Sequence, residues 1–176
     1  MIIRPEEWIM EPDDNGDGLL KGWMLSGDIE YPIPIGTHNV AFDEVLLGEE
    51  QDFDFILECA ERPEVYADEE AYLGSVPAPT MAAEAVIPLD LFSSRKDGQQ
   101  APPPLMIMNG KVTEITEDAA QYGFDEEDIL FSFSCRGNEF DVLLHGEVLE
   151  GLEIKEGNII SSVYWIQGWP CEDKDQ

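Results

Sequence analysis

The sequence predicts a mainly β protein with one short helix. Apolar runs rich in β-branched and aromatic residues recur along the chain, several alternate with polar residues, and Gly, Pro, Asn and Asp cluster between them. The clearest strand is the last apolar run, residues 157–169, which begins at Gly157 and is apolar on both faces in its second half. A run of this kind indicates a central strand rather than an edge strand.

The N-terminal region predicts a hairpin and a further half-buried strand. The dense turn signal Asp-Asp-Asn-Gly-Asp-Gly at residues 13–18 separates the two hairpin strands, and Gly22 and Gly27 mark expected bulges or points of close approach. Pro32 and Pro34 are expected to break the strand pattern. The predicted strands are residues 2–10, 19–29 and 53–58, and residues 40–47 are predicted as either a short strand or a helical turn.

One helix is predicted, over residues 69–73. Asp68 is a residue type that caps helix N-termini, and Gly74 follows the last helical position. An extended apolar run over residues 81–89 follows this helix. The helix therefore interrupts an otherwise extended chain.

The C-terminal half predicts four strands after a polar linker. The linker, residues 93–104, ends in three prolines, which stiffen it. Gly110 is an expected bulge, residues 117–128 form a loop rich in Asp and Glu, and residues 136–138 form a tight turn. The predicted strands are residues 105–116, 129–135, 139–144 and 157–169.

These elements divide the chain into four predicted parts. The N-terminal β-rich region either forms a separate domain or completes the same sheet as the C-terminal strands, and the sequence leaves both open. The parts are the β-rich region (1–92), the linker (93–104), a β-barrel (105–171) and an acidic tail (172–176).

Four blocks of the C-terminal half resemble successive segments of a group of small bacterial proteins with an OB-like barrel. The shared features are structural glycines and apolar positions in residues 81–92, 109–112, 137–142 and 157–168. The resemblance implies an OB-like Greek-key barrel, and it implies no catalytic residues. The chain departs from the group at Asp90, where a glycine is usual, and in the unusual acidity of the loop that precedes Phe131.

The net charge of −30 is the strongest signal in the composition. Acidic residues number 39 and basic residues nine, and residues 1–88 alone contain 21 acidic and three basic residues. Such a field repels nucleic acids and anionic membranes and attracts basic proteins. The same acidity also suits solubility or a high-salt cytoplasm, so charge alone does not select among these three roles.

The cysteines and the apolar runs predict a cytoplasmic protein. Cys59, Cys135 and Cys171 are odd in number and contain no CxxC pair, which indicates free thiols in a reducing compartment. The first residues lack the pattern of a secretory signal, and the apolar runs are too short to span a bilayer.

One turn has partial similarity to a calcium-binding loop. Asp13, Asn15 and Asp17 place oxygen donors at alternate positions, and Gly18 stands at the sixth position. The twelfth position, which needs a bidentate carboxylate, is Met24. A plain hairpin turn is therefore the favoured interpretation, with a calcium site as the alternative.

Motifs of the common enzyme classes are absent from the sequence. His38 and His145 have no metal-ligand spacing, and there is no nucleophile elbow, phosphate loop or dinucleotide fingerprint. The aromatic residues Trp23, Tyr164, Trp165 and Trp169 favour core packing. They would serve a nucleic-acid platform only beside a basic groove, which nine cations among 39 anions do not readily supply.

We therefore expect a non-enzymatic acidic binding protein, of the inhibitor or immunity type, that docks on a basic, nucleic-acid-handling partner by charge mimicry. The acid-rich segments 43–54 and 114–128 would supply the charge. The expected partner-binding residues are Glu49, Glu50, Asp52, Asp125, Glu126, Glu127 and Asp128. The alternatives are a structural or calcium-assisted β-module and an OB-type ligand or oligonucleotide binder.

Overall fold

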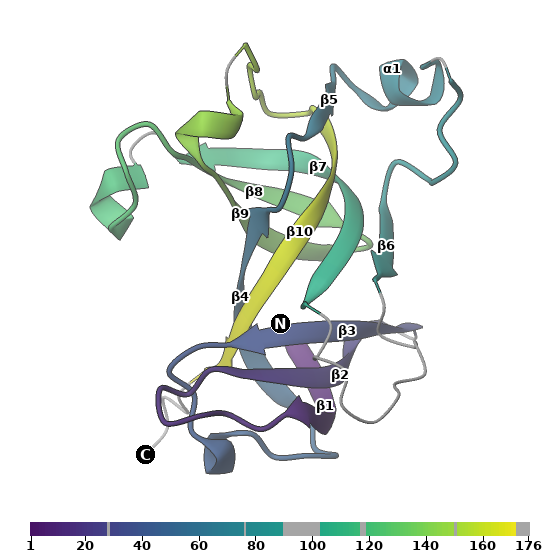
Figure 1. The fold of residues 1–176 in the computed structure, drawn as a ribbon. Helices are drawn as coiled ribbons and strands as arrows, with labels where there is room; N and C mark the ends of the chain where they lie inside the picture. Colours follow the sequence, from purple (N-terminus) through teal and green to yellow (C-terminus); the bar gives the residue numbers. More distant parts are fainter. Residues whose placement is uncertain (28, 76, 90–102, 117–118, 150, 172–176) are drawn as a thin grey trace. The chain divides into compact units, whose positions relative to one another are not determined.

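A computed structural model describes residues 1–27, 29–75, 77–89, 103–116, 119–149 and 151–171. Ten strands form one hydrogen-bonded sheet, and these residues contain a single α-helix (Figure 1). The predicted mainly β class with one short helix is thus confirmed. Residues 93–102 of the predicted linker and the tail 172–176 lie outside the described residues. No helix of the described part is long and apolar enough to cross a membrane.

The strands are β1 (Ile2–Met10), β2 (Gly18–Ser26), β3 (Ile29–Thr37), β4 (Gln51–Cys59), β5 (Glu64–Tyr66), β6 (Ala85–Pro88), β7 (Leu105–Thr116), β8 (Ile129–Cys135), β9 (Asn138–Leu144) and β10 (Ile159–Pro170). The helices are α1 (Glu69–Leu73) and the 3₁₀ turns η1 (Phe42–Glu44), η2 (Ala119–Tyr122) and η3 (Gly146–Val148).

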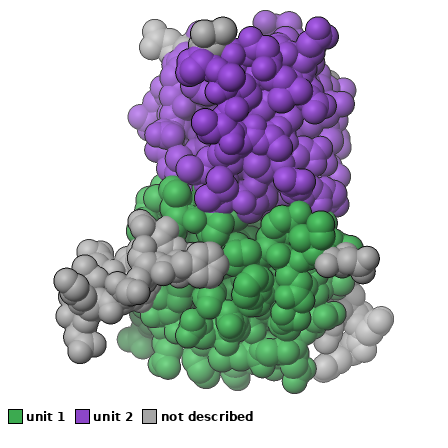
Figure 2. Space-filling view, turned by 90° about the vertical axis from the view of Figure 1, so that its right-hand side faces the viewer, with its two compact units in different colours: residues 1–55, 88–106, 165–176 green, residues 56–87, 107–164 purple. Residues whose placement is uncertain are grey.

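The chain divides into two compact units, coloured separately in Figure 2. Unit 1 comprises residues 1–55, 88–106 and 165–176, and unit 2 comprises residues 56–87 and 107–164. Each unit therefore combines segments from both the predicted N-terminal region and the predicted barrel. The strands β4 and β10 each begin in one unit and end in the other.

In unit 1, five strands close into a hydrogen-bonded ring. The antiparallel meander β1, β2 and β3 is joined to β4 through Ile2 paired with Asp52, and β3 is joined in parallel to β10 at Gln167. β10 pairs with β4 in turn, and the N–H of Cys171 donates to the carbonyl of Asp52 at 2.8 Å. The core inside consists of fully buried residues: Ile3, Leu20, Met24, Ile33, Ile35 and Phe53.

Unit 2 also forms a ring of five strands. Its meander is β7, β8 and β9; β9 pairs in parallel with β4, and β7 pairs with β10. The N–H of Ala60, just after β4, donates to the carbonyl of Val163 in β10 at 2.8 Å. Residues 105–171 thus supply four strands of this ring, and the fifth comes from β4. The core contains Met108, Phe131, Phe133, Phe140, Val142 and Tyr164.

The predicted break at Pro32 and Pro34 is wrong, because both lie inside β3. They pair with Trp23 and Lys21 of β2. Residues two apart in a strand point their backbone nitrogens to the same side, so both prolines fit positions where the ladder needs no N–H donor.

Two glycine predictions also need correction. Gly27 lies in the turn between β2 and β3 with a φ of 58°, so the predicted strand 19–29 is split into a second hairpin there. The register shift in β7 falls between Val112 and Glu114 rather than at Gly110. A Cβ at Gly110 would overlap the Phe133 ring, so this glycine is needed for close packing instead.

The capped helix is confirmed. The Asp68 side chain accepts a hydrogen bond from the N–H of Ala71 at 2.8 Å, and Gly74 is the C-cap. Tyr72 is the buried residue of this helix, and its ring meets Tyr66 edge-on with centroids 5.0 Å apart. One turn of helix therefore attaches to unit 2 through a single aromatic side chain.

Candidate functional site

The segment between β3 and β4, residues 41–50, presents apolar and acidic side chains together, and we call it the acidic loop. Val45 is its single buried residue, 5 % exposed. Phe42, Leu46 and Leu47 are 53 %, 48 % and 44 % exposed. The exposed acidic residues of the loop are Asp43, Glu44, Glu49 and Glu50.

Side-chain hydrogen bonds fix the backbone of the acidic loop. Gln51, the first residue of β4, accepts from the N–H of Leu46 at 2.6 Å and donates to the carbonyl of Glu44 at 3.1 Å. The N–H of Gly48 donates to the carbonyl of Pro5 in β1 at 2.7 Å. A loop that is already ordered loses less conformational entropy when it binds.

An aromatic contact holds the start of the loop against β1. The Phe42 ring stacks on Trp8 with centroids 6.0 Å apart and an interplanar angle of 27°. The buried Trp8 Nε1 has no hydrogen-bond partner within the described residues. Phe42 therefore keeps one face on Trp8 while about half of it stays exposed.

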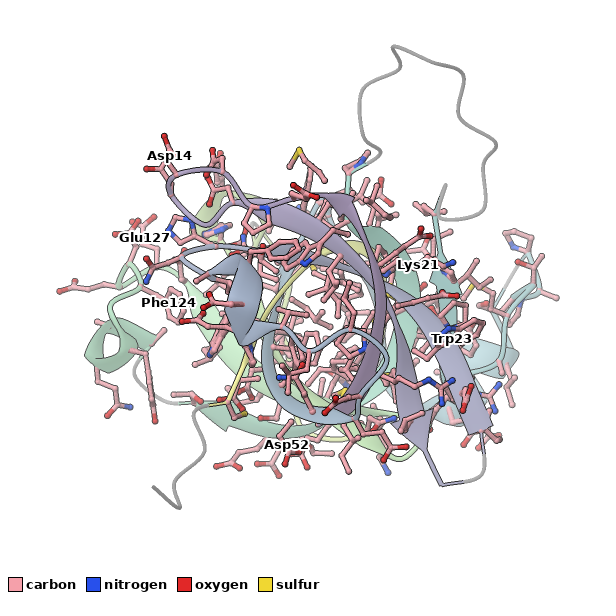
Figure 3. All side chains as sticks on the ribbon, turned by 90° about the horizontal axis from the view of Figure 1, so that it is seen from below. Asp14, Lys21, Trp23, Asp52, Phe124 and Glu127 are labelled. Atoms are coloured by element: carbon pink, nitrogen blue, oxygen red, sulfur yellow. The ribbon has the colours of Figure 1, made fainter. Side chains whose placement is uncertain are left out.

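The structure places the predicted residues Glu49, Glu50 and Asp52 together at the end of this loop and the start of β4. All three are exposed, and the Asp52 side chain retains 71 % of its accessible surface (Figure 3). Their apolar neighbours Phe42, Leu46 and Leu47 were not predicted as site residues, because residues 40–47 were considered only as a short strand or a helical turn. The acidic residues and Gly48 that flank these three apolar residues in the sequence could have indicated an exposed loop.

The second predicted acidic segment, residues 125–128, is a turn in unit 2. Asp125, Glu126 and Glu127 are exposed, and Glu127 is labelled in Figure 3. Asp128 differs, because its side chain is only 6 % exposed. Its carboxylate accepts from the N–H groups of Asp125 (3.2 Å) and Gly146 (3.0 Å), and His145 Nδ1 lies 3.4 Å away. Asp128 therefore holds two loops together.

The turn at residues 13–18 uses its first carboxylate internally. Asp13 Oδ1 accepts from the N–H of Asn15 at 2.8 Å and from the N–H of Asp17 at 3.1 Å, and Asp17 contacts His38. These bonds are those of an Asx-stabilised turn. Within the described residues, no group of three or more His, Cys, Asp or Glu side chains is arranged to hold a metal ion.

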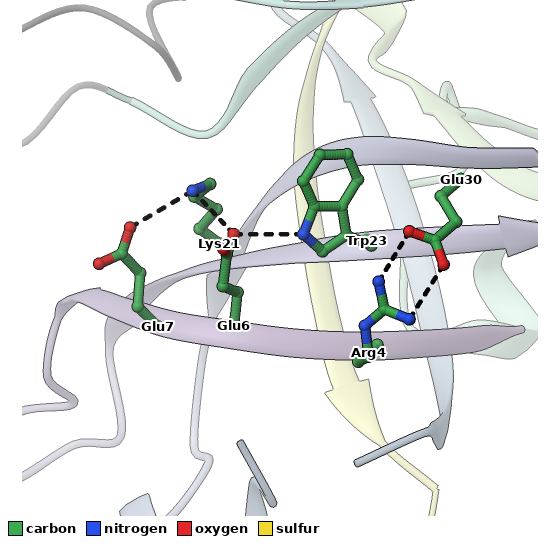
Figure 4. A network of polar contacts seen from close by, with 6 residues as sticks. All are labelled: Arg4, Glu6, Glu7, Lys21, Trp23 and Glu30. Atoms are coloured by element: carbon green, nitrogen blue, oxygen red, sulfur yellow. Dashed lines mark hydrogen bonds and ion pairs between the residues drawn. The ribbon is translucent and has the colours of Figure 1, made fainter. Parts of the chain in front are cut away.

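The outer face of β1, β2 and β3 contains two of the basic residues, and both are ion-paired (Figure 4). Arg4 donates to both carboxylate oxygens of Glu30 at 2.9 and 2.7 Å. Lys21 Nζ lies 2.7 Å from Glu6, which also accepts from Trp23 Nε1 at 3.2 Å. With three carboxylates in the network, counting Glu7, against two cations, this face supplies no positive groove for a nucleic acid.

The cysteine thiols are suited to packing rather than catalysis. Burial raises the pKa of Cys59 and of Cys135 to about 12. Burial also raises the pKa of Cys171, and nearby Asp54 adds to the effect. Because the thiolate is the nucleophilic form, a raised pKa makes all three thiols poor nucleophiles at neutral pH.

The four aromatic residues considered as a platform do not lie on one surface. Tyr164 is fully buried in unit 2, and Trp23 lies on β2 with its indole N–H bonded to Glu6. Trp165 and Trp169 lie on β10 and are 39 % and 41 % exposed. In the order of strands, β3 separates β2 from β10.

Comparison with known proteins adds nothing to this geometry. No protein-family model, no curated protein and no solved structure matches the chain. The candidate site therefore rests on the acidic loop, which combines exposed apolar side chains, negative charge and a fixed backbone.

Proposed function

We propose that this chain is a non-enzymatic acidic binding protein of the cytoplasm that docks on a basic, nucleic-acid-handling protein through the acidic loop. It acts as an inhibitor or immunity-type protein, whose carboxylates take the place of nucleic acid phosphates. The proposal includes an OB-like Greek-key form for the ring that residues 105–171 largely supply.

The observation that carries the proposal is the composition of the acidic loop in a fixed conformation. Binding energy in protein interfaces is concentrated in a few large side chains, and Phe42, Leu46 and Leu47 are available for this role. The surrounding carboxylates accelerate association with a cationic surface and select against acidic partners. The three apolar side chains distinguish this loop from a merely solvated acidic segment.

The test compares two variants that each lose three charges. The loop variant carries Asp43→Asn, Glu49→Gln and Glu50→Gln, and it keeps Glu44, which accepts a hydrogen bond from the N–H of Ala41. The matched control carries Asp125→Asn, Glu126→Gln and Glu127→Gln in unit 2. Each protein is immobilised and exposed to lysate of the native host at about 0.05 M and about 0.5 M salt. At the higher concentration the screening length between charges falls to a few ångströms.

We expect the wild type and the control to retain one basic protein at low salt and to release it at high salt. The loop variant should retain at least tenfold less of it, and the purified partner should lose nucleic acid binding when wild type is added. Retention that depends on neither salt nor the loop charges would contradict charge mimicry. Loss in the unit 2 variant alone would move the docking site to residues 125–127.

A further inference from the structure

β10 exposes two tryptophans on one face of unit 1. Trp165 and Trp169 are 39 % and 41 % exposed, while Ile166 and Gly168 between them are buried. Neither indole forms an aromatic pair with another ring in the described part of the chain. Large exposed aromatic side chains in register on one strand are more typical of an interaction surface than of chance exposure.

The core of unit 1 forces these two indoles outward. A Cβ at Gly168 would lie 2.6 Å from Cε1 of Phe55 and 3.0 Å from Cγ2 of Ile35, so no side chain fits there. Successive residues of a strand point to opposite faces. A slip of one residue would push Trp169 into this occupied space, so the core itself fixes the outward position of Trp165 and Trp169.

Two carboxylates lie on the same outer face, on the neighbouring strand β4. The bonds from Cys171 to Asp52 and from Ala60 to Val163 have one common antiparallel register, in which Asp54 lies opposite Trp169. Phe53 and Phe55 point into the core, so Asp52 and Asp54 point outward with the indoles. Both carboxylates are exposed.

Indole faces and carboxylates together favour a cationic ligand. A guanidinium or ammonium group is attracted to the face of an indole, and a carboxylate nearby adds charge attraction. The same carboxylates repel phosphate. Trp165 and Trp169 are four residues apart on a strand, which corresponds to about 13 Å, and two side chains four residues apart in an extended peptide have the same spacing.

We propose that Trp165 and Trp169, with Asp52 and Asp54, bind an extended segment of a partner protein that carries two Arg or Lys residues four positions apart. Each cation lies over one indole, and Asp54, which lies opposite Trp169, neutralises the cation at that indole from the side, with Asp52 next to it along β4. This inference rests on the proposed function only in taking the partner to be a basic protein, since Trp165, Trp169 and Asp54 lie outside the acidic loop and Asp52 alone adjoins it.

The test uses the full chain and a synthetic peptide, Gly-Arg-Ser-Gly-Ser-Arg-Gly, in which the arginines are four positions apart. Control peptides carry neutral citrulline in place of arginine, or the two arginines side by side. Binding is measured by calorimetry and by shifts of the indole N–H resonances. Trp165→Leu and Trp169→Leu are compared with Trp23→Leu as the matched control, and each variant is first checked for wild-type melting behaviour.

We expect each of Trp165→Leu and Trp169→Leu to weaken binding about fivefold to thirtyfold, which corresponds to the loss of one partly desolvated cation–π contact. Trp23→Leu should leave the affinity unchanged. Asp52→Asn with Asp54→Asn should weaken binding severalfold and reduce its salt dependence. The citrulline peptide should not bind, and the peptide with adjacent arginines should bind more weakly.

Three results would overturn the inference. They are equal affinity for the citrulline peptide, no effect of either β10 variant, and binding of a neutral glucan oligosaccharide at the indoles in place of the peptide. The proposed function fails separately, when removing the charges of the acidic loop leaves capture of the basic partner intact. A partner captured through the loop but indifferent to Trp165 and Trp169 would refute this inference alone.

Discussion

Units 1 and 2 follow the same pairing scheme with different residues. Each unit has a three-stranded antiparallel meander, and the first part of the strand that follows the meander in sequence (β4 in unit 1, β10 in unit 2) belongs to the same unit. The ring is completed by the second part of the other of these two strands, which pairs in parallel with the third strand of the meander. β4 therefore follows the meander of unit 1 and completes unit 2, while β10 follows the meander of unit 2 and completes unit 1.

The two units differ in where their unusual residues lie. Unit 2 has them inside: the buried thiol of Cys135, the tightly packed pair Gly110 and Phe133, and a buried bond between Asn109 and Tyr72. Unit 1 has them outside, in the acidic loop and the two exposed tryptophans. The same ring of strands thus serves mainly stability in one unit and surface presentation in the other.

The largest expected effect concerns the two thiols of unit 2. Cys59 and Cys135 have pKa values raised by burial from 9.0 to about 12, so the folded state keeps its thiols protonated while the unfolded state ionises. This contribution to stability is complete below pH 9 and is lost as the pH rises toward 12. The loss reaches about 3 kcal/mol per thiol at about pH 11. Urea unfolding between about pH 8 and pH 11 measures it.

A labelling experiment sharpens the same contrast. In native protein at about pH 8, a thiol reagent should modify Cys171 of unit 1 first and the partly exposed Cys59 more slowly, because its pKa is raised to about 12. The buried Cys135 should react only under unfolding conditions. Equal rates for all three would show that the thiols of unit 2 are accessible, and the difference between the units would disappear.

The next effect concerns the glycine that Phe133 covers. Gly110→Ala should destabilise the protein by about 3 kcal/mol, because the added methyl group overlaps a fully buried ring. Gly168→Ala, the matched change in unit 1, should cost about 2 kcal/mol, since its Cβ approaches the less buried Phe55. Guanidinium unfolding curves measure both. A larger cost for Gly168→Ala would reverse the assignment of tighter packing to unit 2.

A smaller effect is expected for the buried polar contact of unit 2. The Tyr72 hydroxyl accepts from Asn109 Nδ2 at 2.7 Å and donates to the carbonyl of Met81 at 2.9 Å. Tyr72→Phe removes both bonds from a buried site and should cost about 1–2 kcal/mol in thermal unfolding. Tyr66→Phe, which loses an exposed bond to Glu64, serves as the control and should leave the melting temperature nearly unchanged.

The smallest effect is expected on the outer face of unit 1. Lys21→Gln breaks the ion pairs with Glu6 and Glu7 at the surface, and such pairs contribute less than about 1 kcal/mol. The change should also be smaller at about 0.5 M salt than at about 0.05 M salt. A cost above that of Tyr72→Phe, measured by the same unfolding curves, would mean that this face stabilises unit 1 as strongly as the interior of unit 2.

Local patterns predicted the elements whose causes are local. The helix capped by Asp68 and the strands β7 and β8 have the expected bounds, because capping and alternation are encoded in neighbouring residues. The three-residue strand β5 was missed, since it is defined by its pairing with Ile159, Ile160 and Ser161 of β10. The ring order could not be predicted for the same reason: it depends on pairings between residues far apart in the chain, such as Gly36 with Gln167.

The candidate site was predicted only in its charges. Glu49, Glu50 and Asp52 are exposed as expected, because carboxylates rarely lose their hydration. The outward positions of Leu46 and Leu47 follow from the hydrogen bonds that Gln51 and Pro5 make to this loop. The outward positions of Trp165 and Trp169 follow from the lack of room for a side chain at Gly168. Neither cause is visible before the chain is folded.

Because β4 and β10 are each divided between the two units, neither half of the chain contains all the strands of one ring. A chain ending before residue 103 would contain one meander with an incomplete ring, and its β4 would end without the strands it completes. The missing strand leaves an open sheet edge, which invites aggregation or exchange between copies. Each fragment contains the strand that completes the ring of the other. We therefore expect the two fragments to fold only when they are produced together.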